Sequence, residues 1–145
     1  MAPGAWTMSE NLALARRGMQ LWNEGGVDAF ATLWAPDIVF YELPNLPDTD
    51  VFRGAEALAV HSRELIATMG HFKFEVLSLE ASGPWVFAEM RLHSTGPRSG
   101  VIGDGPHFHL LRYEDGLIAE LHSYSDQAEA RAAFDRVSPA SAPPG

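Results

Sequence analysis

Apolar residues in the first half of the chain recur at helical spacing. One apolar stripe consists of Leu12, Ala15, Met19 and Trp22. It predicts a helix that begins after a Ser9 cap and ends at Gly25-Gly26. Similar spacing predicts a second, short helix over 27–34 and a third helix over 55–70. Each helix should place one apolar face on a common core.

The second half of the chain alternates between apolar and polar residues, which is typical of strands. This alternation predicts strands over 71–80, 85–93, 107–113 and 117–124, and an earlier extended run, bounded by two prolines, covers 38–44. A last short helix should begin near Asp126, because Asp126 and Glu129 have the spacing of a capping box. Helices followed by consecutive antiparallel strands favour the α+β class.

The 145 residues are enough for one domain, which we expect over 9–135 with flexible tails at 1–8 and 136–145. The formal charge of -9 argues against a nucleic-acid partner. No apolar run approaches a membrane span, and the first residues lack signal-peptide character, so we expect a cytoplasmic protein with no membrane partner. Cysteine is absent, so a metal site would need His and carboxylate ligands.

Residues 21–54 and 110–130 carry several linked motifs. They are an N-x-G helix ending, an acid in a strand before Pro44, Phe52-Arg53-Gly54 ahead of the third helix, the Asp115-Gly116 turn, and Tyr124-x-Asp126. From Leu12 to Phe134 the chain resembles the SnoaL-like polyketide cyclase group of the nuclear transport factor 2-like superfamily. The resemblance implies a cone-shaped, curved antiparallel sheet wrapped by three N-terminal helices around one pocket, with no organic cofactor and frequent homodimers.

The same resemblance directs attention to Glu42. An ungapped alignment places Glu42 where ketosteroid isomerase has its catalytic aspartate base, and its context resembles the first pocket strand of limonene-1,2-epoxide hydrolase. Strand parity puts Phe40 and Glu42 on one face and Tyr41 on the other. A carboxylate in an apolar pocket could act as a base near neutral pH, whereas on the other face it would be a solvated strand residue.

His109 resembles the strand position where ketosteroid isomerase has its protonated aspartic acid. An imidazole there could act as a general acid or donate a hydrogen bond to an oxyanion. His107 shares its face, so the pair could line the pocket, but no third metal ligand has readable spacing and we expect no metal site. Gly18 stands where that isomerase has its oxyanion tyrosine, so steroid-type isomerisation by the same residues is not expected.

Polar residues on the predicted strand 85–93 are a second set that could line the pocket. Phe87, Glu89 and Arg91 share one face and could line the pocket, in the strand region where the epoxide hydrolase has its Asp-Arg-Asp set. The third member of that set has no counterpart, because Ser123 falls at the matching position. An apolar inner face with these residues in solvent is the ordinary antiparallel arrangement.

The remaining candidates have structural explanations as well as functional ones. Asp126 resembles an aspartate that serves as acid or base in many SnoaL-like proteins, but the capping box explains it without chemistry. Trp22 could line the pocket or belong to the core. His61 and His71 have the character of surface or helix-end residues.

Three functional hypotheses follow. The preferred one is a cofactor-independent acid-base enzyme of cyclase or isomerase type, acting on a small hydrophobic carbonyl compound of the kind made in secondary metabolism. An epoxide hydrolase is the alternative among enzymes. The third is a binding module without turnover, and a sheet face that recognises a protein partner is a further possibility that nothing in the sequence singles out.

Overall fold

The computed structural model describes residues 7–42, 51–94 and 105–138 and has the expected α+β architecture. In chain order its elements are α1 (Met8–Ala31), β1 (Trp34–Tyr41), β2 (Val51–Arg53), α2 (Ala55–Met69), β3 (Phe72–Ser82), β4 (Trp85–Ser94), β5 (Gly105–Glu114), β6 (Leu117–Tyr124) and α3 (Gln127–Val137). Helices α1 and α3 extend slightly beyond the predicted domain limits of 9 and 135.

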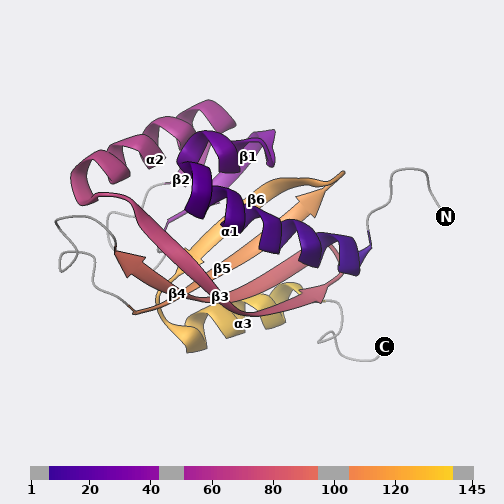
Figure 1. Ribbon diagram of the computed structural model, residues 1–145. Helices are drawn as coiled ribbons and strands as arrows, with labels where there is room; N and C mark the ends of the chain where they lie inside the picture. Colours follow the sequence, from indigo (N-terminus) through magenta and orange to yellow (C-terminus); the bar gives the residue numbers. More distant parts are fainter. Residues whose placement is uncertain (1–6, 43–50, 95–104, 139–145) are drawn as a thin grey trace, which may run out of the picture.

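The strands form one sheet in the order β2-β1-β6-β5-β4-β3 (Figure 1). Strands β3 to β6 form the predicted antiparallel meander, while β1 joins β6 in parallel. The Asp115-Gly116 turn links β5 to β6, and both residues have the positive φ angles that favour this tight connection. The β3–β4 and β5–β6 pairs contain register shifts, which bend a sheet locally.

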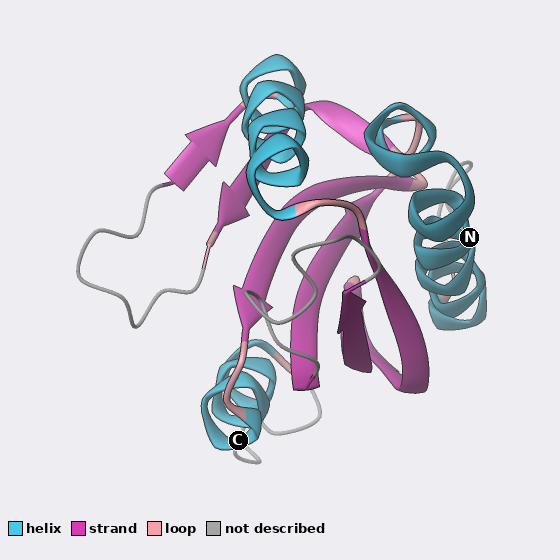
Figure 2. Cartoon of the chain, turned by 60° about the vertical axis from the view of Figure 1, so that its left-hand side comes forward, coloured by secondary structure: helices cyan, strands magenta, loops and turns pink. Residues whose placement is uncertain are grey.

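The three helices divide between the two faces of the curved sheet (Figure 2). Helices α1 and α2 cover the inner face, and α3 packs against the outer face of β4, β5 and β6. Large buried residues on the inner face include Trp22, Ile38 and Met90. A separate cluster around Phe134 of α3 lies on the outer face. The cavity described below therefore lies on the side of the sheet that α1 and α2 cover.

Helix α1 combines the first two predicted helices. Gly26 has φ 73° and ψ -149°, so it breaks the helical geometry where the sequence placed the boundary. The N-cap of the helix lies earlier in the sequence than predicted. It is Thr7 rather than Ser9, and Thr7 forms a reciprocal capping box with Glu10. Strand β1 also begins earlier, at Trp34, and the segment 51–53 is a short strand that pairs with β1.

The packing of strand β4 shows which of its two faces points inward. Val86, Ala88, Met90 and Leu92 belong to the inner core. Phe87 packs on the outer face against Phe134 of α3, with ring centroids 5.4 Å apart. The possibility that the polar face of this strand lines the pocket is therefore wrong, because the apolar alternate residues fill the inner side.

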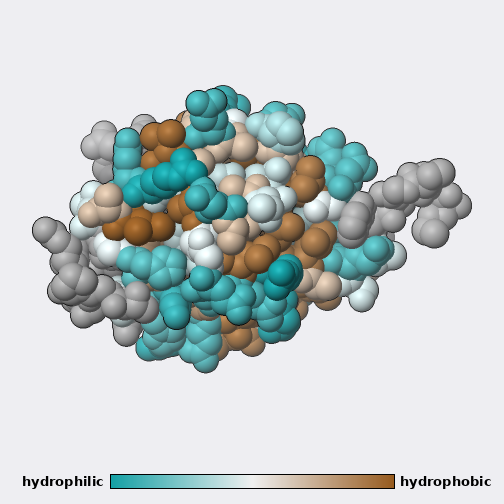
Figure 3. Space-filling view, turned by 45° about the horizontal axis from the view of Figure 1, so that its top comes forward, coloured by the Kyte–Doolittle hydropathy of each residue, from teal (hydrophilic) through white to brown (hydrophobic). Residues whose placement is uncertain are grey.

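Figure 3 shows the face that carries α1 and α2, where hydrophilic residues cover much of the surface and apolar residues appear in patches between them. The exposed large apolar side chains of the described residues are Met8, Val51, Val60 and Leu77, which come from four different elements. No helix within the described ranges is both long and apolar enough to cross a membrane.

Candidate active site

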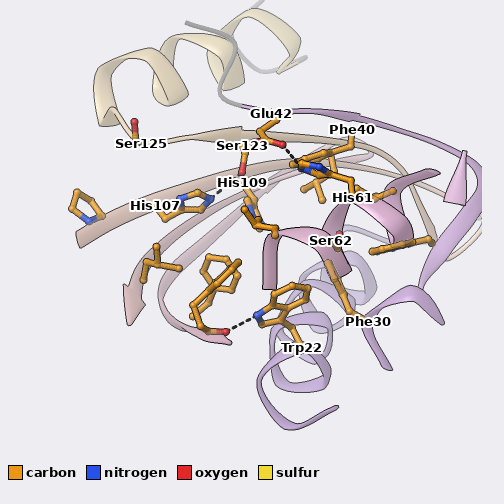
Figure 4. Close-up of a pocket in the computed structure, with 18 of the residues that line it drawn as sticks. Trp22, Phe30, Phe40, Glu42, His61, Ser62, His107, His109, Ser123 and Ser125 are labelled. Atoms are coloured by element: carbon orange, nitrogen blue, oxygen red, sulfur yellow. Dashed lines mark hydrogen bonds and ion pairs between the residues drawn. The ribbon is translucent and has the colours of Figure 1, made fainter. Parts of the chain in front are cut away.

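A cavity of about 360 Å³ lies between the inner face of the sheet and the helices α1 and α2. Its walls are mostly aromatic and aliphatic, and the larger members are Trp22, Phe30, Trp34, Phe40, Phe72 and Phe74. The polar side chains that reach it are Glu42, His61, Ser62, His107, His109, Ser123 and Ser125 (Figure 4). An apolar cavity with a few convergent polar groups is the usual form of a small-molecule site.

Glu42 follows the end of β1 and lies on the inner face, as does Phe40, whereas Tyr41 points outward and stacks on His122. This is the orientation in which the carboxylate enters the cavity. The Glu42 side chain is 31% exposed, so it is neither fully buried nor fully solvated. Glu42 therefore presents a carboxylate at the wall of the cavity.

His61 is the cavity residue that the sequence analysis missed. It projects from α2, its Nε2 contacts Glu42 Oε2 (Figure 4), and its ring stacks on Phe52 with centroids 4.0 Å apart. Neither Nε2 nor Oε2 makes a further hydrogen bond in the described part of the chain. The neighbouring Ser62 also lines the cavity, so one turn of α2 contributes both residues.

The two histidines of β5 lie side by side on the cavity wall. His107 Nε2 is 2.9 Å from Ser123 Oγ of β6, and the rings of His107 and His109 meet edge to face with centroids 5.1 Å apart. His109 is 6% exposed, and its buried Nδ1 has no hydrogen-bond partner among the described residues. Its register partner across the sheet is Ser123.

Burial keeps both imidazoles neutral. Desolvation lowers the pKa of His107 from 6.5 to about 4. Desolvation, together with the proximity of His107, lowers the pKa of His109 well below its usual value. Burial therefore favours the neutral His109 imidazole, which has one hydrogen-bond donor and one acceptor.

Helix α1 contributes Trp22 and Phe30 to the cavity wall. Trp22 belongs to the core and also lines the cavity, and its Nε1 donates a hydrogen bond to the carbonyl of Phe72 at 2.8 Å. Gly18 is buried, and a Cβ atom added to it would lie 3.0 Å from the ring of Phe30. The helix thus has little room for a tyrosine at position 18.

Several predicted site residues lie elsewhere. On β4, the side chain of Glu89 accepts a hydrogen bond from Ser78 at 3.1 Å, and Arg91 is exposed on the same outer face. The Asp126 carboxylate accepts a hydrogen bond from the backbone N–H of Glu129 at 2.8 Å, as the N-cap of α3. The sequence-based expectation that Phe87, Glu89 and Arg91 could contact substrate is corrected by this geometry, and Asp126 has the capping role.

The structure contains no group of three or more His, Asp or Glu side chains placed to share a metal ion within 7–42, 51–94 and 105–138. His107 and His109 are neighbours on one strand face, but their other close contacts are Ser123 and the ring of Phe74. The acid-base groups of the cavity are therefore Glu42 in contact with His61, and the neighbouring imidazoles of His107 and His109.

Comparisons with solved structures give the same fold at low sequence identity. A candidate ketosteroid isomerase from Kribbella flavida is 22% identical, with a TM-score of 0.67 over 95% of this chain and 85% of that chain. A candidate SnoaL-like polyketide cyclase from Jannaschia sp. CCS1 is 21% identical, with a TM-score of 0.64 over 99% and 98%. A cystatin-like protein of unknown function from Xanthomonas campestris is 20% identical, with a TM-score of 0.70 over 86% and 96%.

These identities establish a shared fold rather than a shared reaction. No curated protein matches the sequence. The family model for the SnoaL-like domain matches residues 15–121, a range that runs from α1 into β6 and includes Glu42, His61 and His109. The protein belongs to the SnoaL-like domain family.

Proposed function

We propose that the protein is a cofactor-independent acid-base enzyme of isomerase or cyclase type, acting on a small hydrophobic carbonyl compound. The observation that carries the proposal is that Glu42 and His109, whose Nδ1 has no partner among the described residues, line the same apolar cavity. Glu42 is the base, and His109 is the hydrogen-bond donor to the developing oxyanion. Relatives with isomerase and cyclase names support this reaction class by analogy.

The chemistry requires one proton transfer and one stabilised charge. Glu42 removes a proton from a carbon next to the substrate carbonyl, and the electron pair moves onto the carbonyl oxygen to give an enolate. A neutral imidazole N–H of His109 donates a hydrogen bond to that oxygen. Glu42 then returns the proton to another carbon in an isomerisation. In a cyclisation the enolate carbon instead attacks a second carbonyl carbon, and the resulting alkoxide takes the proton. An oriented donor in a site with little water stabilises the charge more than water would.

The walls of the cavity favour an uncharged substrate. Its lining residues include no lysine or arginine within the part of the chain that the structure describes, so an anionic ligand would find no cationic partner there. The aromatic walls and the volume of about 360 Å³ suit a compact ring system. The epoxide-opening alternative is disfavoured, because Glu89 and Arg91 lie on the outer face and cannot form a charged set in the cavity.

The direct test uses a β,γ-unsaturated cyclohexenone and its larger bicyclic analogue as probes. Migration of the double bond into conjugation is followed by ultraviolet absorbance with wild-type protein and with Glu42→Gln. Acceleration by the wild type that Glu42→Gln removes supports the proposal. Thermal stabilisation by the ketones without any conjugated product would instead identify a binding module.

A further inference from the structure

His61 is the only residue that lines both the inner cavity and a second, open groove on the outside of α2, among the residues that the structure describes. The groove is formed by the turn before α2 and by the outward side of its first turns, with Phe52, Arg53, Glu56 and Glu64 among its residues. The His61 side chain is 20% exposed. His61 therefore lies at the partition between the cavity and the groove.

The contacts of His61 fix its ring in that partition. Phe52 of β2 stacks on the ring with an interplanar angle of 19°, and Phe40 of β1 lies on the cavity side with ring centroids 6.3 Å apart. Nε2 faces Glu42 Oε2. Because the imidazole contacts Oε2, the other carboxylate oxygen, Oε1, is the one that we assign to proton transfer with a substrate.

We infer that His61 is the positioning residue of the base Glu42: it holds Oε2 through Nε2 and so directs Oε1 into the cavity. The inference rests on the proposed function, because it assigns His61 a role through Glu42. Holding a base in its reactive geometry affects the rate steeply, since a displacement of about 1 Å can cost about 10²-fold. The effect should appear in kcat rather than in KM, because His61 acts on the base and not on the bound ketone.

The charged groups around His61 do not offer a substitute for this contact. Arg53, Glu56 and Glu64 line the groove, while Arg63 of α2 is paired with Asp28 of α1. Glu42 is the carboxylate that the structure places against Nε2. Removal of the ring should therefore release the Glu42 carboxylate and open the partition between the groove and the cavity.

That geometry provides a test by chemical rescue. His61→Ala should lower kcat on the β,γ-unsaturated cyclohexenone by about 10- to 100-fold with little change in KM. Imidazole added to the solution should enter through the groove and restore part of the rate, after subtraction of the reaction with imidazole alone. His61→Gln, whose amide can still donate to Oε2, should keep more of the rate than His61→Ala does. Glu42→Gln should not respond to imidazole, because it lacks the carboxylate to be positioned.

The matched control is His93→Ala, which removes the histidine of another His–Glu pair, since His93 Nε2 lies 3.0 Å from Glu75 Oε1 on the outer face. It should keep the wild-type rate and show no rescue. Unchanged kcat in His61→Ala, or an equal loss in His61→Ala and His61→Gln without rescue, overturns the positioning role alone. A wild type that does not isomerise the ketones overturns the proposed function and this inference together.

Discussion

His109 and His122 stand on neighbouring strands but on opposite faces of the sheet, and their surroundings differ in one respect. His122 Nε2 is 2.8 Å from Glu120 Oε1, and its ring stacks on Tyr41 with centroids 4.3 Å apart. His109 faces the cavity, and its buried Nδ1 has no hydrogen-bond partner in the described ranges. His122 on the outer face therefore has a hydrogen-bond partner, whereas the Nδ1 of His109 on the inner face has none among the described residues.

Polar side chains on the outer face of β5 and β6 form a network of hydrogen bonds around Glu120. Arg112 Nε donates to Glu120 at 3.0 Å, and the same guanidinium contacts Glu114. Burial alone would raise the pKa of Glu120, but hydrogen bonds from His122 and Arg112 outweigh it and leave that pKa below its ordinary value. A buried polar atom without a partner costs stability, and the Nδ1 of His109 is such an atom among the described residues.

The largest effect should come from removing the inner carboxylate. Glu42→Gln keeps the shape of the side chain but cannot accept a proton, so isomerisation of the cyclohexenone probe should fall by about 10²- to 10⁴-fold. Steady-state kinetics with matched circular dichroism would measure this. Glu75→Gln, on the outer face of β3, should keep the wild-type rate; equal activity of both variants would remove Glu42 from the mechanism.

Replacing His109 should change activity and stability in opposite directions. His109→Leu removes the oxyanion donor, and kcat should fall by about 10²-fold. The same change removes a buried polar group without a partner, so the free energy of unfolding should rise by about 1 kcal/mol. Denaturant unfolding and kinetics on one preparation test both.

The control for this variant is on the opposite face. His122→Leu breaks the contact with Glu120 and should lower the free energy of unfolding while leaving the rate unchanged. If His109→Leu is the less stable variant and keeps its activity, the contrast between the two faces does not hold.

Much of the fold could be predicted because it depends on local patterns. Helical spacing located α1 and α2, period-two alternation located the meander, and Gly26 marked the break within α1. Strand parity placed Glu42 beside Phe40, since side-chain direction follows from residue order once the strand is known.

The role of His61 could not be predicted, because its contact with Glu42 joins α2 to β1. Nothing within the helix distinguishes this histidine from a surface residue; only the packing of α2 across the end of β1 turns it inward. The inward face of β4 was undetermined for a similar reason. Alternation defines two faces, and the location of α3 on one of them decided which side received Phe87.

Acid should weaken the protein through the inner histidines. The folded state has a pKa for His107 of about 4, against 6.5 for the ordinary group, so between these values the unfolded chain binds a proton that the folded chain does not. The contribution of neutral His107 is complete above pH 6.5 and is lost as pH falls toward 4. His107→Gln can still form a hydrogen bond with Ser123 but does not titrate. On acidification its free energy of unfolding should therefore fall by about 2 kcal/mol less than that of the wild type, a figure reduced for the partial exposure of the ring. Denaturant unfolding at both ends of this range measures it, and parallel curves for the two proteins would contradict it.

The smallest effect should distinguish a cap from a catalyst at Asp126. Asp126→Ala removes the acceptor for the Glu129 N–H and should cost about 1 kcal/mol of unfolding free energy, because α3 loses its N-cap. Asp126→Asn keeps an acceptor oxygen but cannot exchange a proton, so it should preserve both stability and the rate of ketone isomerisation. A normal rate in Asp126→Asn assigns the residue to the fold of the outer layer. A large loss of rate in a stable Asp126→Asn would instead place an acid-base group outside the cavity, and catalysis could then no longer be assigned to the inner face of the sheet alone.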